Sequence, residues 1–392
     1  MRSHANTINK KVVIIYRYVP NYRKQFYEKL RLELERQNIE LELIYGQPGS
    51  FDESKNDSVN INWGIRIKNK IFNIFGKEIY WQPIFSHIKD ADLIIVEQAS
   101  KLLINYLLIL LNVLRIKRIA FWGHGKNFQQ EKASQVGEWI KRILSKNVFW
   151  WFAYNDYSKK IIKQLGFPEN RITSVQNAID TEELTIAKNH FSKEDIEDFK
   201  VNEGIKGSHI GLYVGGMYYE KNLPLLFSAC ELIRLKIPDY EMIFIGSGKD
   251  VSLVKEFDGK YDWVHYVGPK FGSEIVPYFL IADLFLMPGL VGLAILDCFV
   301  MNVPLVTINH NNHSPEISYL EDGVNGIIIK KNDPEKYAEA IINLFRDDEL
   351  LINLRKGCMA SSGKYTLDNM VNNFQNGIIQ ALKIKRWDLD EY

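Results

Sequence analysis

The sequence predicts an α/β protein with two Rossmann-like domains, each a doubly wound parallel sheet, that face one another across a cleft. Short apolar runs suited to buried strands alternate with amphipathic helical patterns through both halves of the chain. The two β/α series are similar in size, and we place the hinge in the charged stretch at 182–208 between them. A length of 392 residues accommodates two such domains comfortably.

The first series begins at the N-terminus with a β-α-β pattern. Its strands are predicted at 12–16, 41–45, 93–96, 118–122, 148–153 and 172–175. Helices are predicted around Phe26 to Leu34 and at 158–165. The apolar segment at 102–114 is too short to cross a bilayer and is broken by two asparagines, so we expect a buried helix.

Two loops of this half carry candidate functional residues. Arg17, Tyr22 and Arg23 follow the first strand, and these types of side chain can hold an anionic or sugar-bearing acceptor. A solvated loop explains the same residues equally well. His124 stands between two glycines at the exit of strand 118–122, where little side-chain cover is expected, so we interpret it as a ligand-contacting histidine.

The stretch at 209–249 opens the second half and reads as strand, tight turn, helix and strand. Gly215 and Gly216 allow a sharp turn and the close approach of a ligand, because neither carries a Cβ. Asn222 is expected to cap the helix, and Gly246 ends the second strand. This crossover places its strand ends at one sheet edge, where ligands usually bind.

At that edge lie Glu220 and Lys221, beside free amides and a helix N-terminus. A lysine in this position suits a phosphate, although a surface lysine on a turn is the simpler explanation. The remaining strands of this half are predicted at 264–267, 284–287 and 304–308, with helices near 273–282, near 292–301 and after 366.

A second constellation lies at 288–297, where a strand exit runs into a helix. The amides of residues 290–293 are expected to be unpaired donors, fit for a diphosphate or a sugar oxygen. Asp297 follows within an otherwise apolar helix and should therefore have partners, because an unpaired buried carboxylate is costly. Vicinal ribose hydroxyls would serve, and a capping or hinge interaction is the alternative.

Composition bounds the function further. A formal charge of +1 gives no general argument for nucleic acid. The three cysteines lack metal-type spacing and suggest small core residues in a reducing compartment, and no export signal is expected at the N-terminus. The basic, aromatic-rich stretch at 65–81 can rest on an anionic membrane surface, although an ordinary exposed segment accounts for it as well.

These motifs, in this order and spacing, resemble the retaining glycosyltransferases of family 4, which have the GT-B fold. GLYVGGMYYEKN, IFIGSGK, VHYVGP, ADLFLMPGLVGLAILDCFVMNVPLVT and SPEISYLEDGVNGIII look like the nucleotide-sugar half. YRYVPNYR, FWGHGKN and VQNAIDT are similar to the acceptor half. The resemblance implies an acceptor domain at 1–185 joined by a returning C-terminal helix at 372–392, and a donor domain at 186–371.

By position, the resemblance makes Lys221 the diphosphate-binding lysine, Asp297 the ribose-binding carboxylate and His124 the histidine that faces the transferred sugar. It implies a donor site that also includes Gly215, Gly216, Glu220, Gly246, Val267, Gly268, Gly289, Leu290, Val291, Gly292 and Leu293. It implies no metal, because basic residues and helix dipoles neutralise the leaving diphosphate.

Two positions depart from the family pattern. The phosphate-binding arginine, five residues before the lysine, is Gly216, and the first glutamate of the paired motif is Gly289. Each missing charged hydrogen bond is worth roughly 1.5–3 kcal/mol, so a substitute is expected. Arg17, Arg23 and Lys126 are candidates to replace the missing cation.

The resulting hypothesis is a cytoplasmic glycosyltransferase of the hexosyltransferase class, with a peripheral position on the inner face of the membrane as an option. It moves a sugar from a nucleoside-diphosphate donor to a glycan or lipid-linked acceptor in cell-surface polysaccharide synthesis, with no cofactor and no nucleic-acid partner. The alternatives are a catalytically weak GT-B relative that acts as a binding protein, a nucleotide-sugar epimerase, and, last, a nicotinamide-dependent dehydrogenase. The last is disfavoured because Val251 stands where a third glycine is expected.

Overall fold

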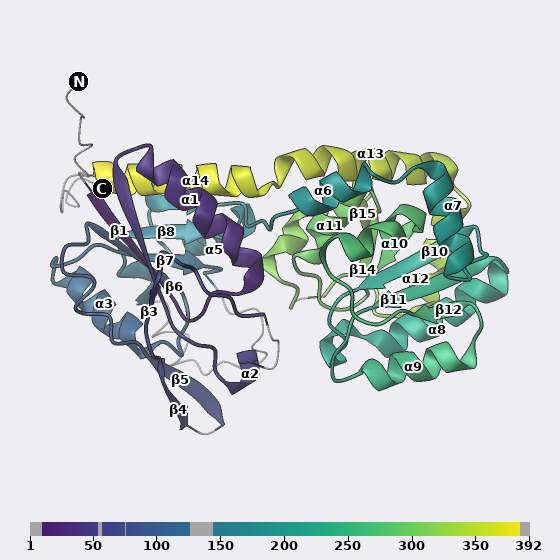
Figure 1. Cartoon of the computed structure of the whole chain (residues 1–392), viewed down its shortest axis with the longest axis horizontal. Coiled ribbons are helices and arrows are strands. Elements are labelled where there is room, and N and C mark those ends of the chain that lie inside the picture. Colours follow the sequence, from purple (N-terminus) through teal and green to yellow (C-terminus); the bar gives the residue numbers. More distant parts are fainter. Residues whose placement is uncertain (1–9, 54–56, 75, 126–143, 311, 385–392) are drawn as a thin grey trace. The chain divides into compact units, whose positions relative to one another are not determined.

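A computed structural model describes residues 10–53, 57–74, 76–125, 144–310 and 312–384. The chain divides into two compact units (Figure 1). Unit 1 comprises Met1–Ile179 and Leu367–Tyr392, and unit 2 comprises Asp180–Thr366. Each unit has its own parallel sheet covered by helices, which confirms the predicted α/β class with two Rossmann-like domains.

The sheet of unit 1 has the strand order β3-β2-β1-β6-β7-β8-β9, and all its neighbouring strands are parallel. The order reverses between β1 and β6, and such a switch point is where ligands bind in open α/β sheets. The strands are β1 (Lys10–Tyr16), β2 (Ile39–Tyr45), β3 (Ile65–Arg66), β6 (Leu93–Glu97), β7 (Ile119–Gly123), β8 (Trp150–Ala153) and β9 (Ile172–Ser174). The helices are η1 (Asn21–Arg23), α1 (Lys24–Glu35), α2 (Ser50–Glu53), α3 (Leu103–Val113), α5 (Asp156–Gln164), η2 (Glu169–Arg171) and α14 (Leu367–Lys383).

A two-stranded antiparallel hairpin, β4 (Lys70–Ile74) and β5 (Lys77–Trp81), also belongs to unit 1. The sequence analysis did not predict it, because its residues do not form an apolar run. The hairpin lies beside α3, as the Tyr80 N–H donates to the Lys101 carbonyl oxygen at 2.8 Å.

The sheet of unit 2 has the order β12-β11-β10-β13-β14-β15, again with parallel neighbours only, and its switch point lies between β10 and β13. The strands are β10 (His209–Val214), β11 (Tyr240–Ile245), β12 (Val264–Tyr266), β13 (Leu284–Leu286), β14 (Leu305–Ile308) and β15 (Gly326–Ile329). The helices are α6 (Glu182–Lys188), α7 (Lys193–Asn202), η3 (Tyr219–Lys221), α8 (Leu223–Lys236), α9 (Val251–Lys260), η4 (Gly272–Ile275), α10 (Val276–Ile281), α11 (Ala294–Met301), η5 (Pro315–Tyr319), α12 (Pro334–Phe345) and α13 (Asp348–Lys364).

The predicted hinge at 182–208 is instead mostly helical. It forms α6 and α7 of unit 2, and Lys188 of α6 donates to the Val300 carbonyl oxygen of α11 at 3.0 Å. The charged composition reflects helices with one solvated face and not a linker. The first unit therefore ends at Ile179 rather than at residue 185.

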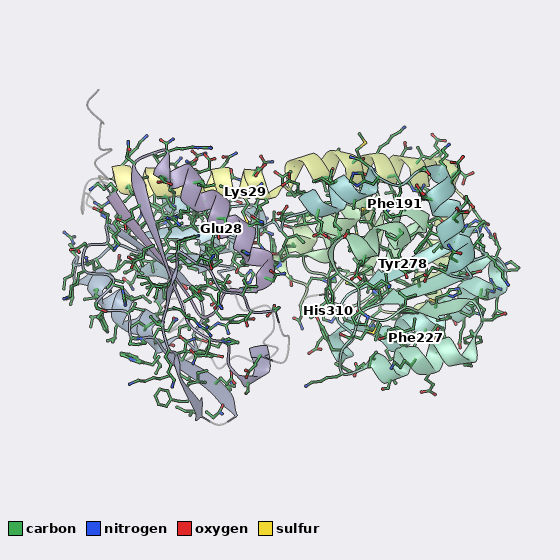
Figure 2. All side chains as sticks on the ribbon, in the orientation of Figure 1. Glu28, Lys29, Phe191, Phe227, Tyr278 and His310 are labelled. Carbon is green, nitrogen blue, oxygen red and sulfur yellow. The ribbon has the colours of Figure 1, made fainter. Side chains whose placement is uncertain are left out.

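The C-terminal helix α14 belongs to unit 1 and begins at Leu367, whereas the sequence prediction placed the returning helix at 372–392. Phe374 explains this placement. Its ring stacks on Phe152 with centroids 4.3 Å apart and meets Phe26 and Trp122 edge-on at 5.2 and 5.0 Å. Lys29 of α1, which is labelled in Figure 2, adds a surface ion pair with Asp368 at 2.7 Å, and this pair contributes little to stability.

The cores are apolar, and the three cysteines, Cys230, Cys298 and Cys358, are buried and free, as predicted. In unit 2, Phe227 of α8, which is labelled in Figure 2, stacks on Phe257 of α9 with centroids 4.5 Å apart. Among the described residues, no helix combines the length and the apolar character needed to span a bilayer.

Candidate functional site

The switch point of unit 2 gathers the two constellations predicted from the sequence. Strand β10 ends before Gly215, and its neighbour β13 ends before Met287. The loops that leave these strands are joined, because the Leu290 N–H donates to the Glu220 carbonyl oxygen at 2.9 Å. Residues almost seventy positions apart therefore form one surface at the carboxyl edge of the sheet.

Lys221 lies at the centre of this surface and is 7% exposed. Its ammonium donates to the Leu290 carbonyl oxygen, lies 3.5 Å from the Met287 sulfur and faces the Tyr218 ring at 5.4 Å from the centroid. Within the described part of the chain, no carboxylate forms an ion pair with it. Burial lowers the pKa of Lys221 to about 8.

The backbone around Lys221 differs from the prediction for Asn222. Asn222 adopts a left-handed conformation with φ of 53° and makes no side-chain cap for α8. Its amide instead donates to the Asn332 side-chain oxygen at 3.0 Å. The conformation turns the chain from η3 into α8, and asparagine tolerates it better than most residues.

Gly289 must be glycine in this arrangement. A Cβ built there would lie 2.3 Å from both the Glu220 carbonyl oxygen and the Lys221 carbonyl carbon, which are backbone atoms. The first glutamate of the family motif therefore has no space at this position. At Gly216, by contrast, a Cβ would meet a ring carbon of Tyr218 at 2.7 Å, and that ring can move.

Two of the four amides predicted to be free at 290–293 are already bonded. Leu290 donates to Glu220, as described above, and the Val291 N–H donates to His313 Nδ1 at 3.0 Å. For the amides of Gly292 and Leu293, the described residues provide no acceptor. These two lie immediately before α11, where the helix N-terminus favours an anion.

His313 is a residue that the sequence analysis missed. It is 4% exposed, and its Nε2 lies 2.7 Å from the Ile308 carbonyl oxygen, so Nε2 carries the proton and Nδ1 accepts from Val291. Burial lowers the pKa of His313 to about 4, which keeps this acceptor available. Its position just beyond strand β14 was the available signal, because parallel strands end at the same edge.

Asp297 lies in the first turn of α11 and is half-buried. Burial raises the pKa of its carboxyl group to about 7. Among the described residues no protein group bonds to this carboxyl group, so the alternative capping or hinge interaction is not found. The carboxyl group is therefore available to hydrogen-bond hydroxyl groups of a ligand.

The ends of β11 and β12 continue the same edge. The Gly246 N–H donates to the Gly268 carbonyl oxygen at 3.0 Å, and the Val267 N–H donates to the Phe244 carbonyl oxygen at 3.1 Å. A Cβ at Gly246 would lie 1.9 Å from the Gly215 carbonyl oxygen, so the turns after β10 and β11 touch through their backbones. The predicted donor residues Gly215, Gly246, Val267 and Gly268 thus lie along one edge.

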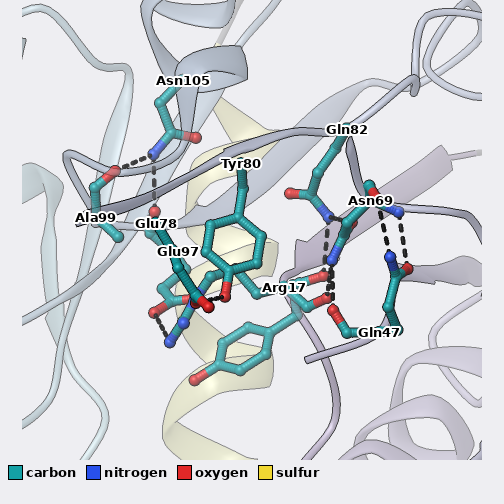
Figure 3. A network of polar contacts seen from close by, with 10 residues as sticks. Arg17, Gln47, Asn69, Glu78, Tyr80, Gln82, Glu97, Ala99 and Asn105 are labelled. Carbon is teal, nitrogen blue, oxygen red and sulfur yellow. Dashed lines mark hydrogen bonds and ion pairs between the residues drawn. The ribbon is translucent and has the colours of Figure 1, made fainter. Parts of the chain in front are cut away.

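At the switch point of unit 1, Arg17 is paired with Glu97 (Figure 3). The guanidinium makes two bonds, Nε to Oε2 at 3.0 Å and Nη2 to Oε1 at 3.2 Å. Asn69 is tied to the backbone of the same loop, as its side chain donates to the Arg17 carbonyl oxygen at 2.9 Å. The predicted role of Arg17 as a cation for an anionic group is weakened, because Glu97 already neutralises its charge.

Arg23 is fully buried, which corrects the prediction of a loop residue that contacts an acceptor directly. Its Nη2 donates to the Asn177 side chain at 2.5 Å, and its guanidinium lies 5.0 Å from the centroids of both Tyr22 and Trp122. No carboxylate of the described residues pairs with it. Tyr22 is 42% exposed and is the acceptor candidate of this loop with accessible surface.

His124 follows strand β7 and is half-buried, with its ring 4.0 Å from that of Tyr154 between centroids. Burial, with a smaller effect of the Arg23 charge, lowers the pKa of His124 to about 4. The imidazole is therefore neutral near pH 7. Lys126, the third candidate for the missing cation, lies outside the described residues.

The side chains of this site are not grouped like the ligands of a metal ion. Among the described residues, no group of three or more His, Cys, Asp or Glu side chains is close enough to hold a metal ion. The charged and polar groups of the unit 2 site are instead Lys221, Asp297 and the amides before α11.

Comparison with known proteins gives a family match that covers most of unit 2. Residues 208–347 match the family described as "Glycosyl transferases group 1". This part of the chain is a group 1 glycosyltransferase domain. The match covers η3, α11 and the loop that contains Gly289, so the glycosyltransferase domain includes the whole edge described above.

Curated relatives are also glycosyltransferases. The chain is 25% identical over 185 residues to an alpha-monoglucosyldiacylglycerol synthase of Acholeplasma laidlawii, covering 45% of each chain. It is 30% identical over 146 residues to a D-inositol 3-phosphate glycosyltransferase of Paenarthrobacter aurescens, covering 35% of each. These alignments thus span less than half the length of either relative.

Solved structures extend the similarity to the whole fold. Anabaena HepE in complex with UDP superposes with a TM-score of 0.70 at 14% identity, over 94% of this chain and 99% of that one. The apo lipopolysaccharide outer core galactosyltransferase WaaB gives 0.65 at 14% identity, over 94% and 99%. The predicted GT-B architecture is confirmed by these neighbours.

Proposed function

We propose that the chain is a retaining glycosyltransferase of family 4 that transfers a sugar from a nucleoside-diphosphate donor. The observation that carries this proposal is Lys221, a buried cation without a carboxylate partner in the described part of the chain. Its charge is destabilising unless an anion binds beside it. The free amides of Gly292 and Leu293 favour the same kind of ligand.

The proposed donor lies along the carboxyl edge of the unit 2 sheet. Lys221 and the α11 amides hold the diphosphate, and Asp297 accepts hydrogen bonds from the ribose hydroxyls. The base lies near Val267 and Gly268. The UDP and UDP-glucose complexes of Anabaena HepE support a uridine diphosphate donor as the first choice for testing.

In the proposed reaction, the bond between the anomeric carbon and the diphosphate oxygen breaks first. An acceptor hydroxyl attacks from the same face, and its proton passes to the departing phosphate oxygen, so retention requires no protein general base. Lys221 and the amides stabilise the charge that develops on the diphosphate. His124 is neutral at pH 7 and is assigned to the transferred sugar.

We assign acceptor binding to unit 1, where Tyr22 has accessible surface, and propose a glycan or lipid-linked acceptor of cell-surface polysaccharide synthesis. The names of two similar proteins support a membrane-associated acceptor, since one is an alpha-monoglucosyldiacylglycerol synthase and the other a lipopolysaccharide outer core galactosyltransferase. The proposed location is the cytoplasmic face of a membrane.

The test is a panel of nucleotide sugars with the whole chain. One donor should raise the melting temperature by mass action and then be turned over only when an acceptor is present. Lys221→Ala should abolish most turnover, and removal of divalent cations by EDTA should leave it unchanged. Product formed without acceptor would indicate an epimerase. Failure of every nucleotide sugar to bind would instead favour a glycan- or partner-binding protein.

A further inference from the structure

Helix α3 carries apolar side chains on both faces, and among the described residues only one face is covered. Ile104, Leu108 and Ile109 are buried in unit 1, as the sequence predicted for the whole helix. The opposite face carries six large side chains at spacings of three, one, three, three and one residues. These outward residues, which we call the α3 stripe, are Leu103, Tyr106, Leu107, Leu110, Val113 and Leu114, and they are 37–58% exposed.

Such a stripe is unusual for a surface that faces only water. Single exposed apolar residues are common, but a contiguous row over three turns marks a contact surface. The row also contains no carboxylate, amide or lysine that would give it a polar boundary in the middle. The α3 stripe is therefore suited to an apolar phase or to another apolar surface.

The charged residues of the segment that carries the α3 stripe are all basic, and Arg115 is exposed, whereas Lys117 and Arg118 donate to the carbonyl oxygens of Ala91 and Ala381. Residues 101–118 contain Lys101, Arg115, Lys117 and Arg118, and this segment has no Asp or Glu. An apolar helix face with basic residues at its ends matches the chemistry of an anionic bilayer, where the apolar side chains enter the interface and the cations meet phosphate groups.

The neighbouring hairpin β4–β5 also exposes apolar and basic side chains, and its one carboxylate, Glu78, accepts hydrogen bonds from Ser50 and Tyr80. Phe72 and Ile74 are 48% and 47% exposed, and Lys70 and Lys77 are exposed as well. The hairpin base is fixed to the sheet by a buried amide network, in which the Gln82 side chain donates to Asn69 Oδ1 at 3.1 Å (Figure 3). Figure 1 shows α3 and the hairpin within the same unit.

We propose that the α3 stripe and the exposed side chains of Phe72 and Ile74 on hairpin β4–β5 form a monotopic docking face by which unit 1 lies on an anionic membrane. The alternative occupant, a second copy, is disfavoured because an isologous contact through this face would bring two basic rims together. The inference extends the proposed function, since it keeps the chain on the surface that holds a lipid-linked acceptor.

The experiment is co-sedimentation of the full chain with vesicles, without any sugar donor, so its result does not depend on turnover. Vesicles of phosphatidylglycerol and phosphatidylcholine in equal parts should bind the protein, and those of phosphatidylcholine alone should bind it at least about tenfold less. Leu110→Gln with Leu114→Gln should weaken binding by about tenfold or more, because burial of two leucines is lost.

A matched control is Leu32→Gln on α1, which is 55% exposed in the same unit and should leave vesicle binding unchanged. Lys70→Gln with Lys77→Gln should reduce binding to the anionic vesicles only. Circular dichroism and melting temperature verify that each variant is folded. The proposal is overturned if the leucine variant co-sediments with anionic vesicles as much as wild type does, or if wild type binds neither kind of vesicle. A vesicle-independent dimer that the leucine variant converts to a monomer would also overturn it.

Discussion

Replacing Lys221 by methionine should make the folded protein more stable and should weaken the binding of a nucleotide. Burial lowers the pKa of Lys221 from 10.5 to about 8, so keeping the ammonium charged at pH 7 costs the folded state about 3 kcal/mol. Methionine has a similar length and an apolar tip that suits Met287 and Tyr218. Loss of the bond to the Leu290 carbonyl oxygen offsets part of the gain, which leaves about 1–2 kcal/mol of net stabilisation.

The same variant should lose affinity for UDP. A charged hydrogen bond to the diphosphate is worth roughly 1.5–3 kcal/mol, so the Kd should rise by about ten- to 150-fold. The wild-type lysine binds fewer protons when folded than when unfolded between about pH 8 and 10.5, and wild-type stability should therefore rise with pH over this window. The methionine variant should lack that rise.

Urea unfolding followed by tryptophan fluorescence measures the first effect, and titration calorimetry with UDP measures the second. Lys236→Met, at an exposed position on α8 of the same unit, is the matched control and should change neither quantity by much. A variant at Lys221 that is less stable than wild type and binds UDP normally would show that the lysine is a structural residue, and the reasoning about an uncompensated charge would be wrong.

Two further predictions concern the loops around the site. Gly289→Ala should destabilise unit 2 by more than about 2 kcal/mol, because its Cβ meets backbone atoms of residues 220 and 221. Gly259→Ala in α9, with open space around it, should stabilise by about 0.5–1 kcal/mol, and similar unfolding midpoints for the two would contradict the packing argument. Burial lowers the pKa of His313 from 6.5 to about 4. The contribution of this histidine to the free energy of unfolding is therefore complete above pH 6.5 and is lost as the pH falls towards 4, by about 3 kcal/mol in all. The stability difference between His313→Gln and wild type, measured by urea unfolding across this range, should follow that curve, and a pH-independent difference would exclude the assignment.

Many of the strands and helices could be predicted from the local pattern of apolar residues in the sequence. The apolar runs that predicted strands at 12–16, 93–96, 210–214 and 284–287 correspond to β1, β6, β10 and β13, the strands at the two switch points. The glycines after β10 and β11 also marked the turns that end these strands. The charged composition of 182–208 was misread as a linker, because helices with few buried residues and linkers have similar composition.

The sequence by itself determined which segments form strands and helices, and which residue types lie at the strand ends, because periodicity and glycine positions are local properties. Tertiary structure decided the state of each side chain there. It paired Arg17 with Glu97, buried Arg23, left Lys221 without a carboxylate and placed the backbone of Glu220 where the Gly289 Cβ would be. It also covered one face of α3 and, among the described residues, left the other exposed, although both faces carry large apolar side chains. Charge neutralisation, burial and free space depend on what residues far along the chain bring to the same point, and no local pattern contains that information.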